Sequence, residues 1–419
     1  MKQAQVTLAY GYQQILVDIP AKNLLGVFCP DEITETVDED RILQEALANP
    51  TGTPPLREIV HPGQKIAIVT SDITRPTPSA MMMPAIAAEL EAAGIPDTDV
   101  VVVLSLGLHR PMTDEEIDEI LSPEYHRRYT VLNHDPEDTV RLGVTARGTP
   151  AEIFRPIVEA DVRICLGNIE FHYFAGYSGG AKAILPGCAS HAAVTANHSW
   201  MVHPQAASGR LTDNPVRLDL EEGVAMLGVD FILNVVVDSD HNIVAAFAGD
   251  VTEAHRRGCT FIHQRGTVKI PRLGDIVVAS AGGFPKDINF YQAHKALENA
   301  KYFVQEGGII ILVAECSEGY GNKTFEKWML ESDSPAEVIQ KIQKEFVLGG
   351  HKAAAIAGIE QRVQIFMVSS MPEDIIRRSR FTPFGSAQAA LDAALHQLGP
   401  KSQVLILPQA GSILPVFHS

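Results

Sequence analysis

The feature that most restricts the fold is a series of short runs rich in Val and Ile. Each is followed by a loop of Gly, Pro, Ser, His or Asp and then by a helical pattern. The runs lie at 65–70, 99–104, 161–166, 231–237, 275–280, 308–314, 363–369 and 403–407. Near-continuous apolar strands of this kind are typical of parallel sheets with helices on both faces. The sequence therefore predicts an α/β fold with largely parallel sheets.

Local signals add detail to this pattern. The N-terminus, MKQAQVTLAYGYQQILVDIP, alternates polar and apolar residues, which predicts a strand that belongs to the fold. Thr113 followed by Glu116 matches a capping box, so a helix should begin there. Asp287 is expected to cap a helix over INFYQAHKALENAKYF, which would place Gln292 and Lys295 on one face.

The length of 419 residues favours two domains. We place the boundary within Gly266 to Leu273, because a polar, helix-like stretch ends before it and a new series of strands and helices begins after it. This predicts an N-terminal α/β domain over 1–268 and a C-terminal α/β domain over 269–419. Ligands of open parallel sheets bind beyond the carboxyl ends of the strands, so we expect the active site in the cleft between the domains.

Composition excludes several classes of function. The formal net charge of −17 disfavours binding to nucleic acid or to an anionic membrane surface. No apolar run approaches the ~20 residues that cross a bilayer, and the N-terminus does not resemble a secretory signal. The five cysteines form no CxxC pair, which argues against a disulfide framework or a cysteine-built zinc site. We therefore expect a cytoplasmic protein with no nucleic-acid or membrane partner.

The loop SDITRPTPS follows the first buried run. It holds Asp72, Thr74 and Arg75 between prolines, and Ser79 can start a helix. Backbone N–H groups at a helix start, together with an arginine, form a natural anion site. The alternative is an Asp–Arg pair that only stabilises a turn.

Histidines follow the buried runs as well. His109 follows a strand end and suits proton transfer near neutral pH, although a single histidine is more often structural. His198, in TANHSW, is a candidate nitrogen ligand for nickel or zinc. The sequence near it offers too few further ligands for a metal site, so a metal there would need a cofactor.

The densest stretch is 172–187, where glycines allow close backbone approach to a ligand and Lys182 follows them. It differs from a phosphate-binding GxxxxGK[ST] loop at Ala181 and Ala183. Lys182 is therefore a candidate for covalent or phosphate contact with something other than ATP and magnesium. The alternative is a surface lysine in a glycine-rich turn.

Five segments, in this order, resemble the nickel-pincer lactate racemase family of 2-hydroxyacid racemases and epimerases. They are SDITRPTPS, LGLHRP, EFHYFAGYSGGAKAILPG, NHSW and YQAHK. The likeness covers most of the chain. It implies a two-domain α/β isomerase that uses Ni(II)-pyridinium-3,5-bisthiocarboxylic acid mononucleotide, supplied by dedicated maturation enzymes that would be transient partners.

The resemblance also implies which residues hold the cofactor. Lys182 would bind it covalently through a thioamide, and His198 would be the nickel ligand from the protein. Further contacts to the cofactor would come from the loop of Asp72, Ile73, Thr74 and Arg75.

The implied reaction interconverts the enantiomers of a small-molecule 2-hydroxy acid. His109 and His172 would be the two acid/base residues, and Gln292 and Lys295 would hold the substrate carboxylate. Hydride transfer to the cofactor, through a 2-keto acid, avoids a carbanion beside an anionic carboxylate. The segment GGHKAAAIAGI, from Gly349, is mostly small and lacks an aromatic side chain where the resemblance suggests that lactate-specific relatives carry a bulky residue, so lactate or a related 2-hydroxy acid is the expected substrate.

Two other functions stay open at this point. Lys182 could form a Schiff base in an aldolase or lyase acting on 2-keto acids. The chain could also be a non-catalytic protein that binds a nucleotide or small anion. His294, His351 and Lys352 could contribute further charge contacts, but we interpret them as solvated surface residues.

Overall fold

The computed structural model describes residues 3–30, 38–238, 241–344 and 346–417. They form two compact units, a larger one of Glu32–Gln264 and a smaller one of Met1–Asp31 with Arg265–Ser419. The division lies near the predicted boundary of 268/269. It differs at the N-terminus, which the sequence analysis placed in the first domain. Residues 24–27 instead form an edge strand of the smaller unit's sheet, because they pair in parallel with Val404–Leu407.

A six-stranded sheet, in the order β13-β12-β9-β4-β5-β6, is the centre of the larger unit. Its strands are β4 (Ile66–Ser71), β5 (Val100–Ser105), β6 (Thr130–Asn133), β9 (Val162–Asn168), β12 (Phe231–Val237) and β13 (Ile243–Gly249). All pairs are parallel except the one with the edge strand β13. The chain adds β5 and β6 on one side of β4, then β9 and β12 on the other. The topological switch point therefore lies between β4 and β9.

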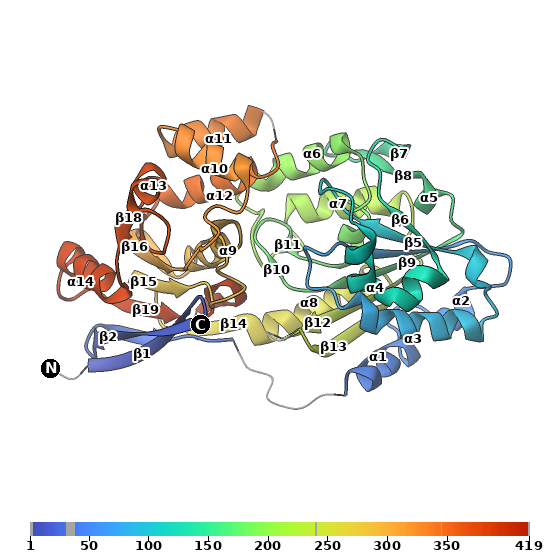
Figure 1. The fold of residues 1–419 in the computed structure, drawn as a ribbon, viewed down its shortest axis with the longest axis horizontal. Helices are drawn as coiled ribbons and strands as arrows, with labels where there is room; N and C mark the ends of the chain where they lie inside the picture. The colour runs from blue at the N-terminus through green and yellow to red at the C-terminus, as the bar shows by residue number, and fades with distance from the viewer. Residues whose placement is uncertain (1–2, 31–37, 239–240, 345, 418–419) are drawn as a thin grey trace. The chain divides into compact units, whose positions relative to one another are not determined.

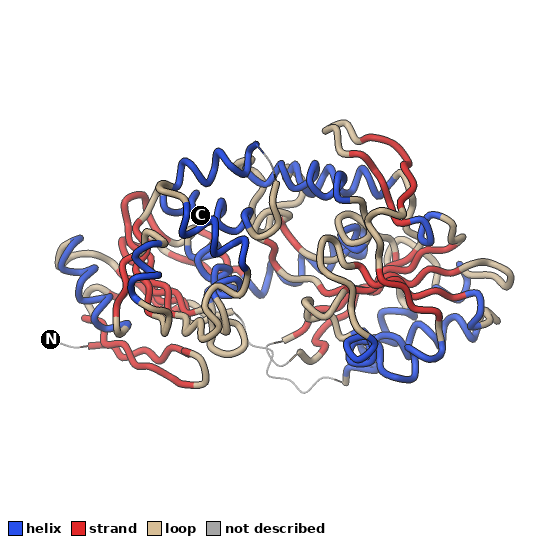
Figure 2. The backbone as a smooth tube through the Cα atoms, turned by 45° about the horizontal axis from the view of Figure 1, so that its top comes forward, coloured by secondary structure: helices blue, strands red, loops and turns tan. Residues whose placement is uncertain are grey.

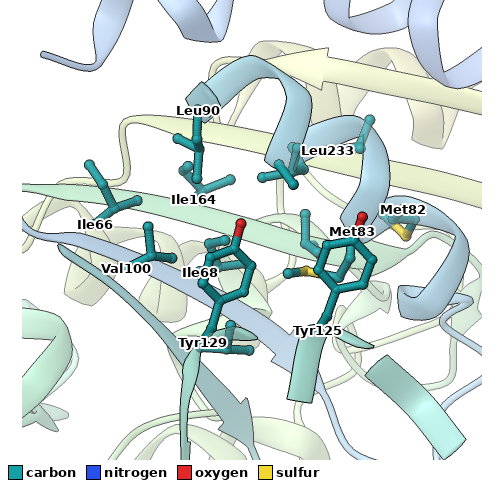
Figure 3. Packing of buried hydrophobic residues seen from close by; sticks show 14 of the residues in the cluster. Ile66, Ile68, Met82, Met83, Leu90, Val100, Tyr125, Tyr129, Ile164 and Leu233 are labelled. Atoms are coloured by element: carbon teal, nitrogen blue, oxygen red, sulfur yellow. The ribbon is translucent and has the colours of Figure 1, made fainter. Parts of the chain in front are cut away.

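Helices cover both faces of this sheet (Figure 1). One face packs against α1 (Glu39–Ala48), α3 (Ser79–Ala92) and α4 (Asp114–Arg128), and the other against α6 (His191–Ser199) and α7 (Pro215–Ala225). Figure 3 shows the first core, where Ile66 and Ile68 of β4 pack with Met82 and Met83 of α3. Val69 belongs to the second core. Since both faces of β4 are buried, its sequence is apolar without alternation.

Shorter elements complete the larger unit. They are α2 (Leu56–Ile59), α5 (Arg155–Val158), the antiparallel pair β7 (Thr139–Val144) and β8 (Pro150–Phe154), the short pair β10 (Phe171–His172) and β11 (Gly176–Tyr177), the 3₁₀ turns at Asp97–Asp99, Gly180–Ala183 and Trp200–Val202, and α8 (Glu253–Gly266), which ends at the division.

The smaller unit contains a six-stranded, fully parallel sheet in the order β18-β17-β16-β15-β19-β3. Its strands are β3 (Leu24–Val27), β15 (Gly274–Ser280), β16 (Val304–Val313), β17 (Gln364–Val368), β18 (Thr382–Phe384) and β19 (Val404–Leu407). Strands β16 to β18 extend to one side of β15, and β19 lies on the other. The switch point of this sheet is therefore between β15 and β19.

Helices and two strand pairs surround this second sheet (Figure 2). The helices are α9 (Phe290–Ala300), α10 (Lys323–Glu331), α11 (Pro335–Lys344), α12 (Gly350–Glu360), α13 (Glu373–Arg378) and α14 (Ala387–Leu398), with a 3₁₀ turn at Ala410–Ser412. The antiparallel hairpin of β1 (Gln3–Tyr10) and β2 (Gln13–Pro20) shares a core with α14, and β14 (Thr267–Ile270) pairs with β20 (Leu414–Phe417).

The structure confirms the α/β fold class, a strand at each predicted apolar run and the capping box at Thr113. The predicted cap at Asp287 is wrong. Asn289 caps α9, because its side chain accepts a hydrogen bond from the backbone N–H of Gln292 at 3.1 Å. The buried Asp287 carboxylate instead accepts N–H bonds from Gly11 at 2.7 Å and Glu315 at 3.1 Å. Within the described ranges, no helix combines the length and apolarity that a membrane span requires.

His134, directly after β6, should make the stability of the fold depend on pH. The ring is 3% exposed and lies edge-on to Phe154. Burial lowers its pKa to about 4, and the charge of Asp135 and the backbone of Ala189 oppose this only in part. An unfolded histidine titrates near pH ~6.5, so protons bind preferentially to the unfolded chain. The stabilisation is complete above that pH and is lost as the pH falls toward about 4.

Between pH ~6.5 and pH ~4, the unfolding free energy of the wild type should therefore fall by about 3 kcal/mol more than that of the His134→Leu variant. Urea unfolding at a series of pH values measures this difference. His61→Leu, at an exposed position, is the control and should follow the wild type. If the unfolding free energies of wild type and His134→Leu depended equally on pH, the prediction would be contradicted.

Candidate active site

Most of the predicted site residues of the larger unit lie in loops that follow the strands at or beside its switch point. Asp72, Thr74 and Arg75 follow β4, His109 follows β5, and the segment from His172 to Lys182 follows β9. In open parallel sheets the crevice at such a point is where ligands bind. The strand order thus brings residues from distant parts of the sequence to one edge of the sheet. The side chain of Ile73, by contrast, packs against the apolar core.

Asp72 and His109 form a hydrogen-bonded pair. Asp72 is buried, with 3% exposure, and its Oδ2 lies 2.5 Å from Nδ1 of His109. The Thr74 hydroxyl donates to the other carboxylate oxygen at 2.7 Å. Burial alone would raise the pKa of Asp72, but the hydrogen bonds from His109 and Thr74 and the charges of His109 and Arg75 lower it.

A carboxylate at Nδ1 determines what His109 can do. The ionised Asp72 only accepts hydrogen bonds, so Nδ1 must carry the ring proton. In the neutral ring the lone pair is then on Nε2. The His109 side chain is partly exposed. The pair has the arrangement of a general base and the acid residue that orients it. The sequence analysis assigned Asp72 only to cofactor contact and missed this partnership.

His172 lies in the tight hairpin of β10 and β11, opposite Gly176. The backbone N–H of Ala175 donates to His172 Nδ1 at 3.2 Å, so in the neutral ring the proton is on Nε2. Burial, followed by the charges of Lys182, Arg75 and His198, holds the pKa of His172 well below its usual value. His172 is therefore a neutral hydrogen-bond donor at Nε2, whereas His109 has its Nδ1 against the Asp72 carboxylate.

Lys182 lies in a 3₁₀ turn, Gly180–Ala183, that begins at two glycines with positive φ. Gly180 has φ +59°, and a side chain there would come within 2.8 Å of the His255 ring. The N–H of Gly180 donates to Asn234 Oδ1 of β12 at 2.7 Å, which attaches the turn to the sheet. Burial, together with the positive charges of Arg75 and Arg217, holds the pKa of Lys182 well below the usual lysine value, and Glu170 opposes this. An uncharged amine is a nucleophile.

His198 is in the last turn of α6, and its ring lies 4.9 Å from the ring of Phe174, which also contacts His172 at 4.6 Å. Burial, then the charges of Lys182 and Arg75, lowers its pKa to about 3. The imidazole is therefore neutral, as a metal ligand must be. Its Nδ1 lies 3.2 Å from the side-chain oxygen of Asn197.

Arg217 of α7 supports the candidate site, and the sequence analysis missed it. It is fully buried, its Nε donates to the Ala175 carbonyl at 3.2 Å, and its Nη2 donates to the Tyr177 carbonyl. It thereby holds the hairpin that carries His172. Arg217, Leu220 and Val224 share one buried helix face, so an arginine on an apolar 3.6-residue stripe was the available signal.

The surroundings of Lys182 are cationic in a chain whose net charge is −17. The charges of Arg75 and Arg217 both act on Lys182, and the charge of Glu170 opposes them. Such a concentration of positive charge favours an anionic ligand.

The predicted substrate residues belong to the smaller unit. Gln292 and Lys295 lie on α9, which follows β15 at that unit's own switch point; Gln292 is half-buried and Lys295 is exposed. The nearby His294, His351 and Lys352, interpreted above as surface residues, are in fact buried. Lys352 Nζ lies 2.5 Å from the Tyr291 carbonyl oxygen and 3.3 Å from His294 Nδ1, because α12 packs against α9.

The donor set fits a cofactor that brings most of its own metal ligands. In the part of the chain that the structure describes, no group of three or more His, Cys, Asp or Glu side chains could hold a metal ion. The larger unit does offer a neutral imidazole at His198 and, at Lys182, an amine whose pKa is held well below the usual lysine value. One nitrogen ligand and one nucleophile can hold a group that supplies the remaining ligands, but they cannot bind a bare metal ion strongly.

Comparisons with known proteins agree with this arrangement. A sequence model of the lactate racemase N-terminal domain matches residues 10–209, and one of the lactate racemase C-terminal domain matches residues 270–414. A lactate racemase of Thermoanaerobacterium thermosaccharolyticum is 33% identical, covering 98% of this chain and 99% of that protein. A lactate racemase of Lactiplantibacillus plantarum is 30% identical, with the same coverage.

Solved structures give the same result. The lactate racemase apoprotein from Thermoanaerobacterium thermosaccharolyticum superposes with a TM-score of 0.91 at 32% identity, covering 99% of this chain and all of that one (100%). A Thermotoga maritima protein, with a TM-score of 0.66 and 19% identity over 90% of this chain and 98% of that one, shares the fold. The matches over the full length define a two-unit α/β racemase, an isomerase. The chain belongs to the lactate racemase family.

The Asp72–His109 pair makes a prediction about rate. Asp72→Asn keeps the volume but removes the negative charge and can reverse the ring tautomer, so kcat for racemisation should fall about 100-fold or more. A chiral assay on enzyme from a cofactor-producing host, with the unfolding midpoint measured in parallel, tests this. Asp118→Asn, which breaks a similar contact to His126 at 2.9 Å on the surface, is the control. Equal activity of Asp72→Asn and wild type would remove Asp72 from the orienting role.

Arg217 makes a prediction about Lys182. Arg217→Met removes a donor from two buried carbonyl groups, of which that of Ala175 keeps the N–H of Tyr177, so the free energy of unfolding should fall by about 1 to 3 kcal/mol. The loss of its charge should also raise the pKa of Lys182, so acylation of Lys182 by a small uncharged reagent should need a higher pH. Peptide mass spectrometry across a pH series measures the labelling.

Arg163→Met is the matched control. Arg163 also donates to backbone carbonyls, those of Ile157 at 3.1 Å and Ala160 at 2.6 Å. Its loss should lower stability without moving the labelling profile of Lys182. An unchanged profile in Arg217→Met would show that the charge of Arg217 does not affect the amine.

Proposed function

We propose that this protein interconverts the enantiomers of lactate or a related 2-hydroxy acid with a nickel-pincer nucleotide held by Lys182 and His198. One observation carries the proposal: Lys182, His198 and two histidines with different hydrogen-bonding partners belong to one unit, where burial and neighbouring cations hold the pKa values of Lys182 and His198 below their usual values. Family membership supports it, because the relatives above are named lactate racemases.

Lys182 would attach the cofactor covalently, for which its amine must be unprotonated. The burial and the neighbouring cations that lower the pKa of Lys182 meet this requirement. His198 would provide the nickel ligand of the protein, and the loop of Asp72 to Arg75 would contact the nucleotide. When bound, the cofactor would accept a hydride from the α-carbon of the substrate and return it, which avoids a carbanion beside the carboxylate.

His109 would accept the hydroxyl proton of one enantiomer at Nε2, and the Asp72 carboxylate would stabilise the resulting imidazolium. His172 would serve the other enantiomer. In the state seen here it carries its proton on Nε2, so it can donate a hydrogen bond to the substrate oxygen. To act as a base, it would have to move this proton to Nδ1 and release the N–H of Ala175.

Gln292 and Lys295 would hold the substrate carboxylate, since an amide and an ammonium group both donate hydrogen bonds to it. Dedicated maturation enzymes would supply the cofactor as transient partners. We propose the cytoplasm as the location, where thiols stay reduced; Cys165, Cys188, Cys259 and Cys316 are buried free thiols.

Protein from a cofactor-producing host should carry a mass adduct at Lys182 and interconvert at least one 2-hydroxy acid from a chiral panel. Lys182→Ala should lose both the adduct and the activity. His109→Ala and His172→Ala should keep the adduct and lose racemisation. Because the two enantiomers are equal in free energy, kcat/KM must fall by the same factor in both directions. An active Lys182→Ala variant would refute the covalent cofactor, and a fully active histidine variant would remove that residue from the pair.

A further inference from the structure

A buried carboxylate lies behind His198. Asp219 of α7 is 0% exposed, and its side chain accepts three hydrogen bonds. The hydroxyls of Thr145 and Thr149, in the turn between β7 and β8, donate at 2.5 and 2.6 Å, and Asn197 Nδ2 donates at 2.8 Å. A carboxylate with three donors in a dry interior is held in one position.

This carboxylate determines which way the amide of Asn197 points. Asn197 is also 0% exposed, and its Nδ2 donates both to Asp219 and to the backbone carbonyl of Val216 at 3.0 Å. Exchanging the amide nitrogen and oxygen would turn an oxygen toward two acceptors in the protein interior. The nitrogen must therefore face Asp219, and the amide oxygen must face His198.

The amide oxygen in turn determines the tautomer of His198. Asn197 Oδ1 lies 3.2 Å from His198 Nδ1 and can only accept. In a neutral ring, Nδ1 must then carry the proton, which leaves the lone pair on Nε2. A hydrogen bond from the second ring nitrogen is the usual way in which proteins fix the tautomer and orientation of a metal-binding histidine.

We propose that Asp219 and Asn197 are positioning residues that fix His198 with its proton on Nδ1, so that Nε2 is presented to nickel. The proposal rests on the proposed function, in which His198 is the nickel ligand. Asp219 acts through Asn197, and Asn197 acts through the ring. The α6–α7 packing and the β7–β8 turn thereby control the metal ligand.

The apoprotein gives the direct test, because the tautomer does not need the cofactor. Long-range ¹H–¹⁵N correlation spectra of histidine-labelled protein distinguish the two neutral tautomers. In the wild type we expect His198 with its proton on Nδ1. Asn197→Ala should produce a mixture in which the Nε2-protonated form is present. Ser199→Ala, which alters the exposed neighbour whose hydroxyl donates to the Ala196 carbonyl at 2.7 Å, should leave the tautomer unchanged.

A second variant separates this role from a purely structural one. In the double variant Asn197→Asp with Asp219→Asn, an acceptor for the Nδ1 proton is kept and the two side chains still form a donor–acceptor pair, although the Val216 carbonyl loses its donor, as it also does in Asn197→Ala. We expect it to restore the wild-type tautomer and to unfold at a midpoint closer to wild type than Asn197→Ala does. An Nε2-protonated ring in the wild type, or an unchanged ring in a folded Asn197→Ala variant, would overturn the proposal.

Nickel retention tests the consequence. In protein from a cofactor-producing host, Asn197→Ala should keep the Lys182 adduct but release nickel to a competing chelator about 10- to 100-fold more readily than wild type. The same retention in both would overturn the effect on the metal. If the wild type carries no adduct and no nickel, the proposed function fails, whereas the tautomer measurement still tests whether Asp219 and Asn197 orient His198. The two failures are thus distinguishable.

Discussion

The strand order around β4 is the constraint on which the site depends. After the chain has built β4, β5 and β6, it returns to the other side of β4 to place β9, so the loops after β4 and β9 separate at their carboxyl ends. Asp72 follows β4 and the segment from His172 to Lys182 follows β9, the two strands that flank this point, and His109 follows the neighbouring strand β5. The smaller unit has a switch point of the same kind between β15 and β19, and the helix α9 that follows β15 carries Gln292 and Lys295.

Burial then sets the charge state of the groups at this edge. His172, Lys182 and His198 are each held toward their neutral forms, first by burial and then by one another and by Arg75. Asp72 is the exception, since His109 and Thr74 donate hydrogen bonds to it and keep it ionised despite burial. The site therefore contains a histidine paired with a carboxylate and, beside it, two histidines and a lysine whose pKa values are held below their usual values. A loop of the same residues in water would contain a protonated lysine and could not react in this way.

The sequence predicted the sheets well because parallel strands that are buried on both faces leave an unambiguous apolar run, as in 66–71 or 309–313. It predicted less well where a residue type has several uses. Asp287 and Asn289 can both cap a helix, and only the fold decides that Asp287 is needed by Gly11 and Glu315. In the sequence alone, Arg217 and Lys352 resemble cations of the protein surface, although both are buried. Their partners are backbone carbonyls, which have no signature in the sequence.

The same reasoning explains why the orienting residues were not found. His109 and His198 stand out because imidazole chemistry is rare and recognisable, but Asp72, Asn197 and Asp219 act by accepting or donating one hydrogen bond in a defined direction. That direction comes from packing: Asn197 points its oxygen at His198 only because α7 places a carboxylate and a carbonyl on its other side. Reversing the Asn197 amide would bring its oxygen against the Asp219 carboxylate and the Val216 carbonyl in a low-dielectric interior, at a cost of about 1 to 3 kcal/mol for each unsatisfied group. The stability of the α6–α7 contact and the protonation of the proposed metal ligand are therefore set by the same two hydrogen bonds, and a change in one must alter the other.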